Sequence, residues 1–330
     1  MPLLSPLRKE WPIFADMSLL HRGKVRDTYQ LKDDELLLVV ATDSVSIFDF
    51  VLNCMIPQKG KVLAAMTHFW LDYLETVGIK THFVTAGSAI DSYLPKKYRH
   101  NRELQSRAIV VKKLTMPKVE FIARNALTGS ALSAYKKTGM VAGVKLPGGL
   151  QDGDGLLYML DTPTTKAEVG HDLPLLADDI RKQYPKETEL LLQIANLLKH
   201  QCATKGIYLA DLKLEIGLDR FGTPVVGDEV GTPDSCRFWD MQAWRDSRML
   251  EMRKAPPPND KQFLRMLGIE WGINDESRFD PTNPADVARV HALVVPQETV
   301  HATSDLYLRI FRRLTGMSLE EYQIRRLKIQ

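Results

Sequence analysis

The sequence has few cysteines, and none is placed to form a disulfide framework or a zinc site. Cys54, Cys202 and Cys236 are odd in number and far apart, without a CxxC pair or a histidine at metal-ligand spacing. This usage excludes a disulfide-stapled secreted domain and favours a reducing compartment. We therefore expect a cytoplasmic protein without structural zinc.

Long apolar runs and an excess of one charge are also missing. No stretch of about 20 apolar residues occurs, and prolines and charges interrupt residues 1–15, so neither a membrane span nor a signal peptide is expected. The 44 basic and 41 acidic residues give a net charge of only +3, which does not favour a nucleic-acid partner. With 44% apolar residues in 330 positions, we expect two or three packed lobes, in a monomer or a small homo-oligomer.

Hydrophobic periodicity predicts a mixture of strands and helices. Strands are expected at residues 23–31, 35–41, 107–114 and 119–126, with a hairpin at 207–228. Helices are expected at residues 61–77, 129–137 and 186–205, with several more after residue 241. Residues 146–174 hold many Gly, Asp, Pro and Thr residues without periodicity, so a long functional loop is expected there.

The predicted hairpin carries a row of charges. Strand alternation places Asp211, Lys213 and Glu215 on one face, and Asp228 shares that face if Glu215 lies opposite residue 226 or 228. Two carboxylates beside a lysine suit Mg²⁺ held against the phosphates of a nucleotide, because Mg²⁺ takes a few hard oxygen ligands and leaves room for phosphate. The alternative is a solvated strand face whose charges only improve solubility.

Two arginines beside turns predict an anion site. Arg237 follows the hairpin in a polar segment, and arginine grips phosphate in a bidentate manner. Arg124 precedes a helix start at Gly129 and Ser130, where backbone amides, a hydroxyl and a guanidinium can meet an anion. The alternatives are that Arg237 pairs with Asp234 in a plain turn, and that Ser130 only caps the helix.

A third basic element lies near the start of the chain. Lys24 and Arg26 are expected on one face of a strand next to Gly23, so that backbone amides and cations can cover nucleotide phosphates. The segment is not a GxxxxGK[ST] loop. The alternative is a basic strand edge that only guards against edge pairing.

Seven blocks resemble the phosphoribosylaminoimidazole-succinocarboxamide synthase (SAICAR synthetase) family. They are GKVRDTY at 23–29, IPQKGKVLAAMTHFW at 56–70, EFIARNALTGSA at 120–131, LPGGLQDGD at 146–154, DTPTTKAEVGHD at 161–172, LADLKLEIG at 209–217 and GDEVGTPDSCRFWD at 227–240. The blocks extend over most of the chain, and their common order is specific, whereas a single block would not be.

The resemblance implies an α+β fold with two lobes and an ATP cleft between them. It implies an N-terminal β-rich, ATP-clasping lobe at residues 1–115, a central α+β lobe with the substrate and metal sites at 116–240, and C-terminal helices at 241–330 packed on the central lobe. It also implies a ligase that uses ATP and Mg²⁺. L-Aspartate would be joined to the carboxylate of carboxyaminoimidazole ribotide (CAIR) through an acyl phosphate, giving SAICAR, ADP and phosphate in purine biosynthesis. The implied partners are therefore the small molecules ATP, CAIR and L-aspartate.

The resemblance further implies roles for single residues. The implied ATP-binding residues are Lys24, Arg26, Lys112 and Leu114. The implied Mg²⁺ ligands are Glu215 and Asp228. The implied substrate-binding residues are Arg124, Ser130, Asp234, Arg237, Lys166 and Asp172. The implied catalytic residues are Lys213, at the reacting carboxylate, and Asp211.

Departures from the family pattern leave these metal and phosphate ligands in place. Ser44 stands where an arginine commonly occurs, which puts a substrate contact from that segment in doubt. Lys118 is an apparent extra residue, and Ile216 replaces a usual aromatic.

Two other functions compete with a ligase. A small-molecule kinase would share the ATP site but would transfer phosphate to a hydroxyl and ignore aspartate. A nucleotide-sensing or RNA-binding module should gather basic residues with interleaved aromatics on a surface. Here the cations lie beside acids, which favours the enzymes.

Overall fold

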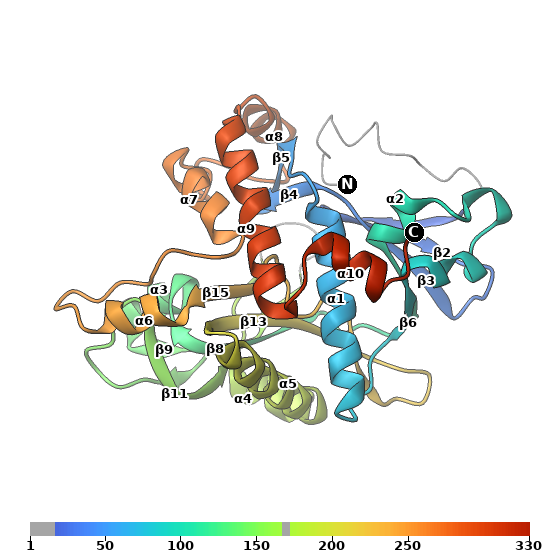
Figure 1. Ribbon diagram of the computed structural model, residues 1–330. Helices are drawn as coiled ribbons and strands as arrows, with labels where there is room; N and C mark the ends of the chain where they lie inside the picture. Colours follow the sequence, from blue (N-terminus) through green and yellow to red (C-terminus); the bar gives the residue numbers. More distant parts are fainter. Residues whose placement is uncertain (1–16, 167–171) are drawn as a thin grey trace. The chain divides into compact units, whose positions relative to one another are not determined.

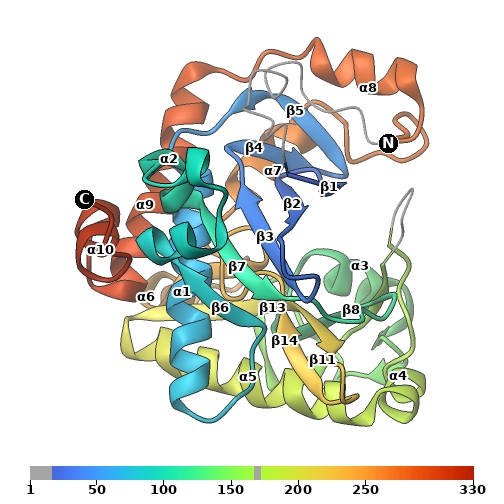
Figure 2. The same ribbon diagram turned by 90° about the vertical axis from the view of Figure 1, so that its right-hand side faces the viewer.

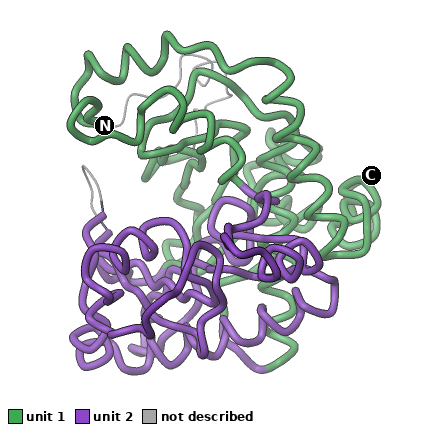
Figure 3. Tube along the Cα trace, turned by 90° about the vertical axis from the view of Figure 1, so that its left-hand side faces the viewer, with its two compact units in different colours: residues 1–77, 81–113, 261–330 green, residues 78–80, 114–260 purple. Residues whose placement is uncertain are grey.

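The computed structural model describes residues 17–166 and 172–330, which divide into two compact units (Figure 3). Unit 1 comprises the chain up to Val77, Thr81–Lys113 and Lys261–Gln330. Unit 2 comprises Gly78–Lys80 and Leu114–Asp260. Both contain helices and strands (Figure 1), so the predicted mixture of α and β structure is confirmed.

Unit 1 contains a five-stranded antiparallel sheet in the order β1-β2-β3-β7-β6 (Figure 2). Its strands are β1 (Leu19–Arg22), β2 (Arg26–Gln30), β3 (Leu36–Ala41), β6 (Phe83–Ala86) and β7 (Ala108–Lys112). Alternate residues of the inner strands, such as Tyr29, Leu38 and Val110, are buried together with Leu104 of α2 (Arg102–Arg107). The strands expected at 23–31, 35–41 and 107–114 are therefore confirmed within a few residues.

A separate hairpin in unit 1 forms a second core with helices from the end of the chain. The hairpin consists of β4 (Ser44–Ile47) and β5 (Phe50–Met55). Its two turn residues, Phe48 and Asp49, both have positive φ, as expected for a two-residue turn of primed type. Apolar residues of this hairpin pack with residues from α7 (Gln262–Glu270), α8 (Pro284–His291) and α9 (Gln297–Thr315).

The helices after residue 241 differ from the expectation that all of them pack on the central lobe. α6 (Met241–Arg248) does lie in unit 2, where Trp244 stacks on Tyr208 with ring centroids 4.0 Å apart. In contrast, α7 to α10 (Leu319–Arg325) lie in unit 1. The reason is that their apolar side chains complete the core around β4 and β5 and pack on α1 (Lys59–Thr76).

His68 in α1 makes the stability of unit 1 sensitive to acid. Its Nδ1 atom lies 2.7 Å from the hydroxyl oxygen of Tyr322 in α10, and burial lowers the pKa of His68 to about 4. In the unfolded chain a histidine titrates near pH 6.5, so the unfolded state binds more protons as the pH falls from that value toward 4. Stability is therefore lost across this window, by about 2 kcal/mol at about pH 5.

Replacing His68 with asparagine tests this acid sensitivity. Urea unfolding at about pH 7.5 and about pH 5 should show a smaller loss of stability in His68→Asn than in the original protein. Equal losses in the two proteins would contradict a role for His68.

Unit 2 is built on a six-stranded antiparallel sheet with β13 (Ile207–Leu218) near its centre. The sheet has the order β11-β8-β13-β14, with β12 paired to β8 and β15 paired to β13. The other strands are β8 (Val119–Leu127), β11 (Asp154–Asp161), β12 (Thr164–Thr165), β14 (Pro224–Gly227) and β15 (Cys236–Asp240). The predicted hairpin at 207–228 is confirmed by β13 and β14, and the strand at 119–126 by β8.

Helices and a small hairpin complete unit 2. They are α3 (Gly129–Thr138), β9 (Met140–Val141), β10 (Val144–Lys145), α4 (Ala177–Gln183) and α5 (Pro185–Thr204). α5 packs on β13 and β8 (Figure 1). The helices expected at 129–137 and 186–205 are therefore confirmed, as is the helix at 61–77 of unit 1, which is α1.

The expectation of one long loop at 146–174 is wrong for residues 154–165, which contain β11 and β12. Pairing of β11 with β8 is interrupted by an irregularity between Gly155 and Leu160, so the alternation that marks a strand is broken in the sequence. Residues 167–171 of this segment lie outside the described part of the chain.

The described residues contain no helix with the length and apolarity of a membrane span. The three cysteines are all free and buried, in agreement with the expectation that they form no disulfide.

Candidate active site

Three adjacent strands of unit 2 place two arginines around one carboxylate. Asp211 of β13 lies opposite Arg124 of β8 on one side and opposite Arg237 of β15 on the other. Its Oδ2 atom accepts hydrogen bonds from Nη1 of Arg124 at 3.1 Å and from Nη1 of Arg237 at 2.8 Å. Arg124 and Asp211 are both buried, so this pairing fixes where the two guanidinium groups lie.

Arg124, Asp211 and Arg237, called the Asp211 trio below, together carry a net positive charge. Burial lowers the pKa of Arg124, the Asp211 carboxylate raises it and the neighbouring Arg237 lowers it. Because a guanidinium titrates so far above neutral pH, Arg124 remains charged despite this shift. One carboxylate between two arginines leaves one net positive charge that can attract an anion. The alternative in which Arg237 merely closes a turn does not account for its bond to Asp211.

The start of α3 brings more anion-binding groups to the same place. The hydroxyl oxygen of Ser130 accepts a hydrogen bond from Nη2 of Arg124 at 3.1 Å. The N-cap residue is Thr128, whose side chain makes no cap bond to the helix and instead donates to Asp152 at 2.8 Å. The alternative that Ser130 only caps the helix is therefore wrong. The helix start, with no side-chain cap, can offer its amides to a phosphate together with the arginines.

Gly129 allows the Arg237 guanidinium to pack directly on the backbone. Gly129 has φ +58°, and a Cβ atom at this position would lie 2.7 Å from both terminal nitrogens of Arg237. Glycine is thus required twice, by the left-handed conformation and by the close approach of the side chain.

Two polar partners of the predicted residues were missed from the sequence. Thr162 accepts a hydrogen bond from Nε of Arg124 at 2.9 Å and thereby fixes the plane of its guanidinium. Glu120 accepts one from Nζ of Lys213 at 2.7 Å. Glu120 could have been predicted from the sequence, because it lies four residues before Arg124 in the same strand and so points to the same face of the sheet. Thr162 could not, because it follows β11 in a segment without periodicity.

Lys213 is held protonated by its acidic neighbours. Burial by itself would lower its pKa, but the carboxylates of Glu120, Glu215 and Glu229 raise it, and the net shift is upward. Its ammonium group is half-buried and bonded to Glu120. A row of alternating charges on one strand face is therefore present as predicted, and its buried and half-buried positions exclude a merely solvated face.

Of the two predicted metal ligands, Glu215 lies in β13, whereas Asp228 directly follows the end of β14. Glu215 lies opposite Gly227, and not opposite residue 226 or 228. β14 ends at Gly227, and Asp228 has φ +53°, so the chain leaves the ladder directly after the residue opposite Glu215. The expected sharing of a face through strand alternation is therefore wrong. Asp228 directly follows Gly227, the residue opposite Glu215, and lies outside the ladder.

The chemistry of these donors fits a magnesium ion carried with a nucleotide. The described part of the chain has no group of three His, Cys, Asp or Glu side chains that could hold a metal. Magnesium, however, is commonly bound through one or two carboxylates, with phosphate oxygens and water as the other ligands. Glu215 in β13 and Asp228 directly after the neighbouring β14 supply two carboxylates, which suits this pattern and is too few for a closed, all-protein site.

The segment after β14 is tied back to β13 by a compact turn. The Thr232 hydroxyl donates to Glu229 at 2.5 Å and accepts from the backbone N–H of Asp234 at 3.3 Å. The backbone N–H of Lys213 donates to the carbonyl oxygen of Ser235 at 2.9 Å. This turn carries Asp234 in a half-buried position, so Asp234 and Arg237 belong to one rigid connection.

The predicted phosphate element of unit 1 is a turn, and this corrects the expectation that Lys24 and Arg26 share a strand face. β2 begins at Arg26, and Lys24 lies in the turn before it, where the N–H of Gly23 donates to the carbonyl of Arg26 at 2.8 Å. The Lys24 ammonium lies 2.5 Å from Oδ1 of Asp49 in the turn of the β4–β5 hairpin.

Ser44 supplies no exposed group in place of the family's arginine. It is fully buried in β4 and donates a hydrogen bond to the sulfur of Met55 at 3.6 Å. A direct substrate contact from this position is therefore excluded by its burial.

The implied ATP-binding residues Lys112 and Leu114 lie on either side of the point where the chain passes from unit 1 to unit 2. Lys112 ends β7 in unit 1 and is exposed, whereas Leu114 begins a stretch of unit 2. Thr115 exchanges two backbone hydrogen bonds of 2.9 Å with Leu218. Gly217 permits this approach, because a Cβ there would lie 2.9 Å from Cβ of Leu114 and 2.5 Å from the sulfur of Met116.

The two predicted residues from segment 146–174 have different surroundings. Lys166 is half-buried and pairs with Glu215 at 2.5 Å between Nζ and Oε2, which brings it into the row of charges. Asp172 is exposed.

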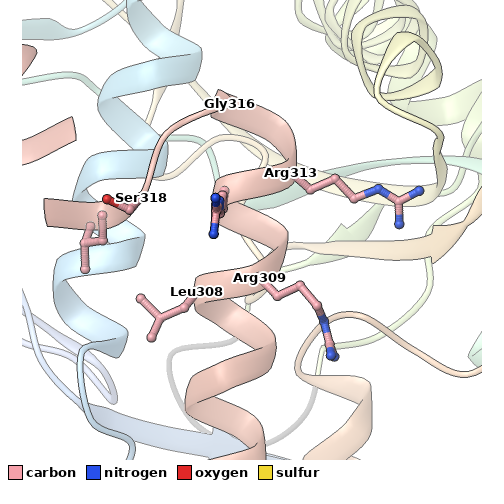
Figure 4. Close-up of a pocket in the computed structure, with 7 residues that line it drawn as sticks. Leu308, Arg309, Arg313, Gly316 and Ser318 are labelled. Atoms are coloured by element: carbon pink, nitrogen blue, oxygen red, sulfur yellow. The ribbon is translucent and has the colours of Figure 1, made fainter. Parts of the chain in front are cut away.

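One pocket of about 650 Å³ lies in unit 1 along α9 and the start of α10. Its lining includes Arg309 and Arg313, which extend from the same side of α9 (Figure 4). None of the predicted site residues lines it, so it is separate from the candidate active site.

Comparisons with known proteins match one enzyme family over most of the chain. Residues 19–278 match the profile of the family described as SAICAR synthetase. Phosphoribosylaminoimidazole-succinocarboxamide synthase of Mycobacterium sp. (strain JLS) is 37% identical, over 94% of this chain and 98% of the relative. The enzyme of the same name from Rhodococcus jostii (strain RHA1) is 38% identical, over 94% of this chain and 99% of the relative.

A solved structure shares the fold over nearly the whole chain. It is described as SAICAR-synthase from Saccharomyces cerevisiae complexed with SAICAR. It is 30% identical, with a TM-score of 0.75, and the match covers 93% of this chain and 97% of that one. The profile match over residues 19–278, together with relatives 37–38% identical over 94% of the chain, shows that this chain belongs to the SAICAR synthetase family.

Proposed function

We propose that this chain joins L-aspartate to the carboxylate of CAIR at the expense of ATP, giving SAICAR, ADP and phosphate in purine biosynthesis. The observation that carries the proposal is the row of charged side chains along β13, from the Asp211 trio through Lys213 to Glu215. Two comparisons support the proposal. Relatives that are 37–38% identical over nearly the whole chain are named phosphoribosylaminoimidazole-succinocarboxamide synthase, and the similar yeast structure is described as a complex with SAICAR.

The arginine cluster is the proposed site for the ribotide phosphate. Arg124, Arg237 and Ser130 present two guanidinium groups and a hydroxyl beside an uncapped helix start, which suits a dianionic phosphate. We assign Asp211 a positioning role, because its bonds are made to the two arginines and it is buried. This role replaces the direct catalytic role implied by the family resemblance.

Lys213 is the proposed residue at the reacting carboxylate. A carboxylate is a poor acyl donor, and its phosphorylation supplies a leaving group. The protonated ammonium of Lys213 offsets negative charge as the carboxylate oxygen attacks the γ-phosphorus. The acyl carbon then accepts the amine of aspartate, and phosphate leaves with that carboxylate oxygen. No side-chain nucleophile is needed, so catalysis depends on positioning and charge.

Glu215 and Asp228 are the proposed holders of a magnesium ion that, when bound, neutralises part of the charge of the nucleotide phosphates. Lys24, Arg26 and the backbone from Lys112 to Leu114 stay the proposed ATP contacts. Asp234 stays a proposed ribotide contact, and Lys166 and Asp172 stay proposed substrate contacts. The cytoplasmic location, the absence of nucleic-acid and membrane partners, and the oligomeric state remain predictions from the sequence.

An assay that omits one substrate at a time tests the proposed function. With ATP, CAIR and aspartate together, we expect equal amounts of phosphate and of a new amide, and no amide when any one is left out. A small-molecule kinase would instead consume ATP at the same rate with and without aspartate. That result would reject the ligase in favour of the kinase.

A further inference from the structure

Lys166 pairs with the carboxylate that is proposed to hold the metal. Its Nζ atom lies 2.5 Å from Oε2 of Glu215. The pairing is built on a fixed backbone. Thr164 and Thr165 pair with Glu120 and Val119 of β8, and the N–H of Lys166 donates to the carbonyl of Lys118 at 3.1 Å. The lysine is therefore presented to Glu215 by the sheet itself.

The other cation of this row is already engaged elsewhere. Lys213 donates to Glu120 at 2.7 Å. Glu215, in contrast, forms its ion pair with Lys166. A metal ion and an ammonium group compete for the same carboxylate oxygens, because both need their negative charge in direct contact.

We propose that Lys166 is an exchangeable counterion of Glu215, which Mg²⁺ displaces when it binds. This inference rests on the proposed function, because it takes Glu215 as a metal ligand. The Lys166 side chain is 39% exposed, so its ion pair is weak and a divalent ion can replace it. The displaced ammonium then becomes available to a carboxylate of the incoming dicarboxylic amino acid. Metal occupancy would thereby prepare the site for its anionic substrate.

Direct binding of Mn²⁺, as a paramagnetic substitute for Mg²⁺, tests the competition without any turnover. In Lys166→Met the affinity for Mn²⁺ is expected to rise by about two- to fivefold, because the competing ammonium is gone. Lys166→Arg retains the charge and should bind Mn²⁺ about as the original protein does. Lys145→Met is the matched control, since Lys145 is an exposed lysine of the same unit. Unchanged or weaker binding by Lys166→Met would overturn the proposal.

A second measurement separates displacement from simple repulsion between like charges. Reductive methylation followed by mass spectrometry reports how accessible each lysine amine is. Saturating Mg²⁺ should accelerate the labelling of Lys166 and leave the labelling of Lys145 unchanged. Repulsion without contact predicts that the labelling of Lys166 does not change, and this result would reject the exchange.

The failure of the exchange and the failure of the metal assignment give different results. If the original protein binds Mn²⁺ and Glu215→Gln does not, Glu215 is a ligand, and Lys166→Met then decides the exchange alone. If Glu215→Gln binds Mn²⁺ as tightly as the original protein, the metal assignment fails and the exchange fails with it.

Discussion

Replacing Glu215 or Asp228 with alanine is expected to abolish ADP formation while the protein stays folded. In the proposed function both carboxylates hold Mg²⁺ against the nucleotide phosphates, Glu215 from β13 and Asp228 from the position directly after β14. Loss of one hard oxygen ligand removes several kcal/mol of charge stabilisation, which corresponds to a fall in rate of about a thousandfold or more. The rate of ADP release at ordinary Mg²⁺ concentration measures this effect.

The matched control for these variants is Glu189→Ala, which removes an exposed glutamate of α5 in the same unit. It should leave the rate unchanged. Circular dichroism and urea unfolding of each variant separate loss of the metal site from loss of the fold. Turnover like that of the original protein in both Glu215→Ala and Asp228→Ala would refute the metal assignment.

Replacing Arg237 with alanine is expected to weaken binding of the ribotide by about 2–4 kcal/mol, as for a largely desolvated, charge-assisted contact. The variant removes one of two guanidinium groups from the proposed phosphate site and leaves Asp211 paired with Arg124 alone. The affinity for ATP should change little, because no ATP phosphate is assigned to this cluster. Calorimetric titration with CAIR and, separately, with a nonhydrolysable ATP analogue measures the two effects.

Arg220→Ala provides the control for Arg237→Ala. Arg220 is an exposed arginine in the turn between β13 and β14, so its loss changes the net charge equally without touching the cluster. Equal weakening of both ligands by Arg237→Ala would argue against a phosphate site at this place, as would equal weakening of CAIR by both variants.

The parts of the fold that follow local periodicity could be predicted from the sequence. α1, α5 and the β13–β14 hairpin each have a strong helical or alternating pattern, and their bounds fall close to the expected residues. β11 could not be recognised by alternation, because its centre is a continuous apolar run and its pairing with β8 is irregular between Gly155 and Leu160. The sequence also could not predict which unit α7 to α10 pack in. An amphipathic pattern indicates that a helix has a buried face, but it does not indicate which core that face packs against.

In the candidate site, too, local patterns could be predicted from the sequence, whereas contacts between strands could not. Alternation alone placed Asp211, Lys213 and Glu215 on one strand face, and this face is confirmed. The bond of Asp211 to two arginines depends on which strands flank β13, and that order is a property of the sheet and not of any single segment. The left-handed Asp228 and the turn at Lys24 were missed, since neither is marked by a glycine or a proline at the position itself.

The path of one carboxylate oxygen tests the proposed ligation most directly. When CAIR carries ¹⁸O in its carboxylate, an acyl phosphate transfers one labelled oxygen to the phosphate released in each turnover. This happens because the attacking oxygen becomes the bridge to phosphorus and leaves with it when the amine of aspartate arrives. Mass spectrometry of the released phosphate should therefore detect the label. Unlabelled phosphate, formed together with SAICAR, would contradict activation of the carboxylate by ATP.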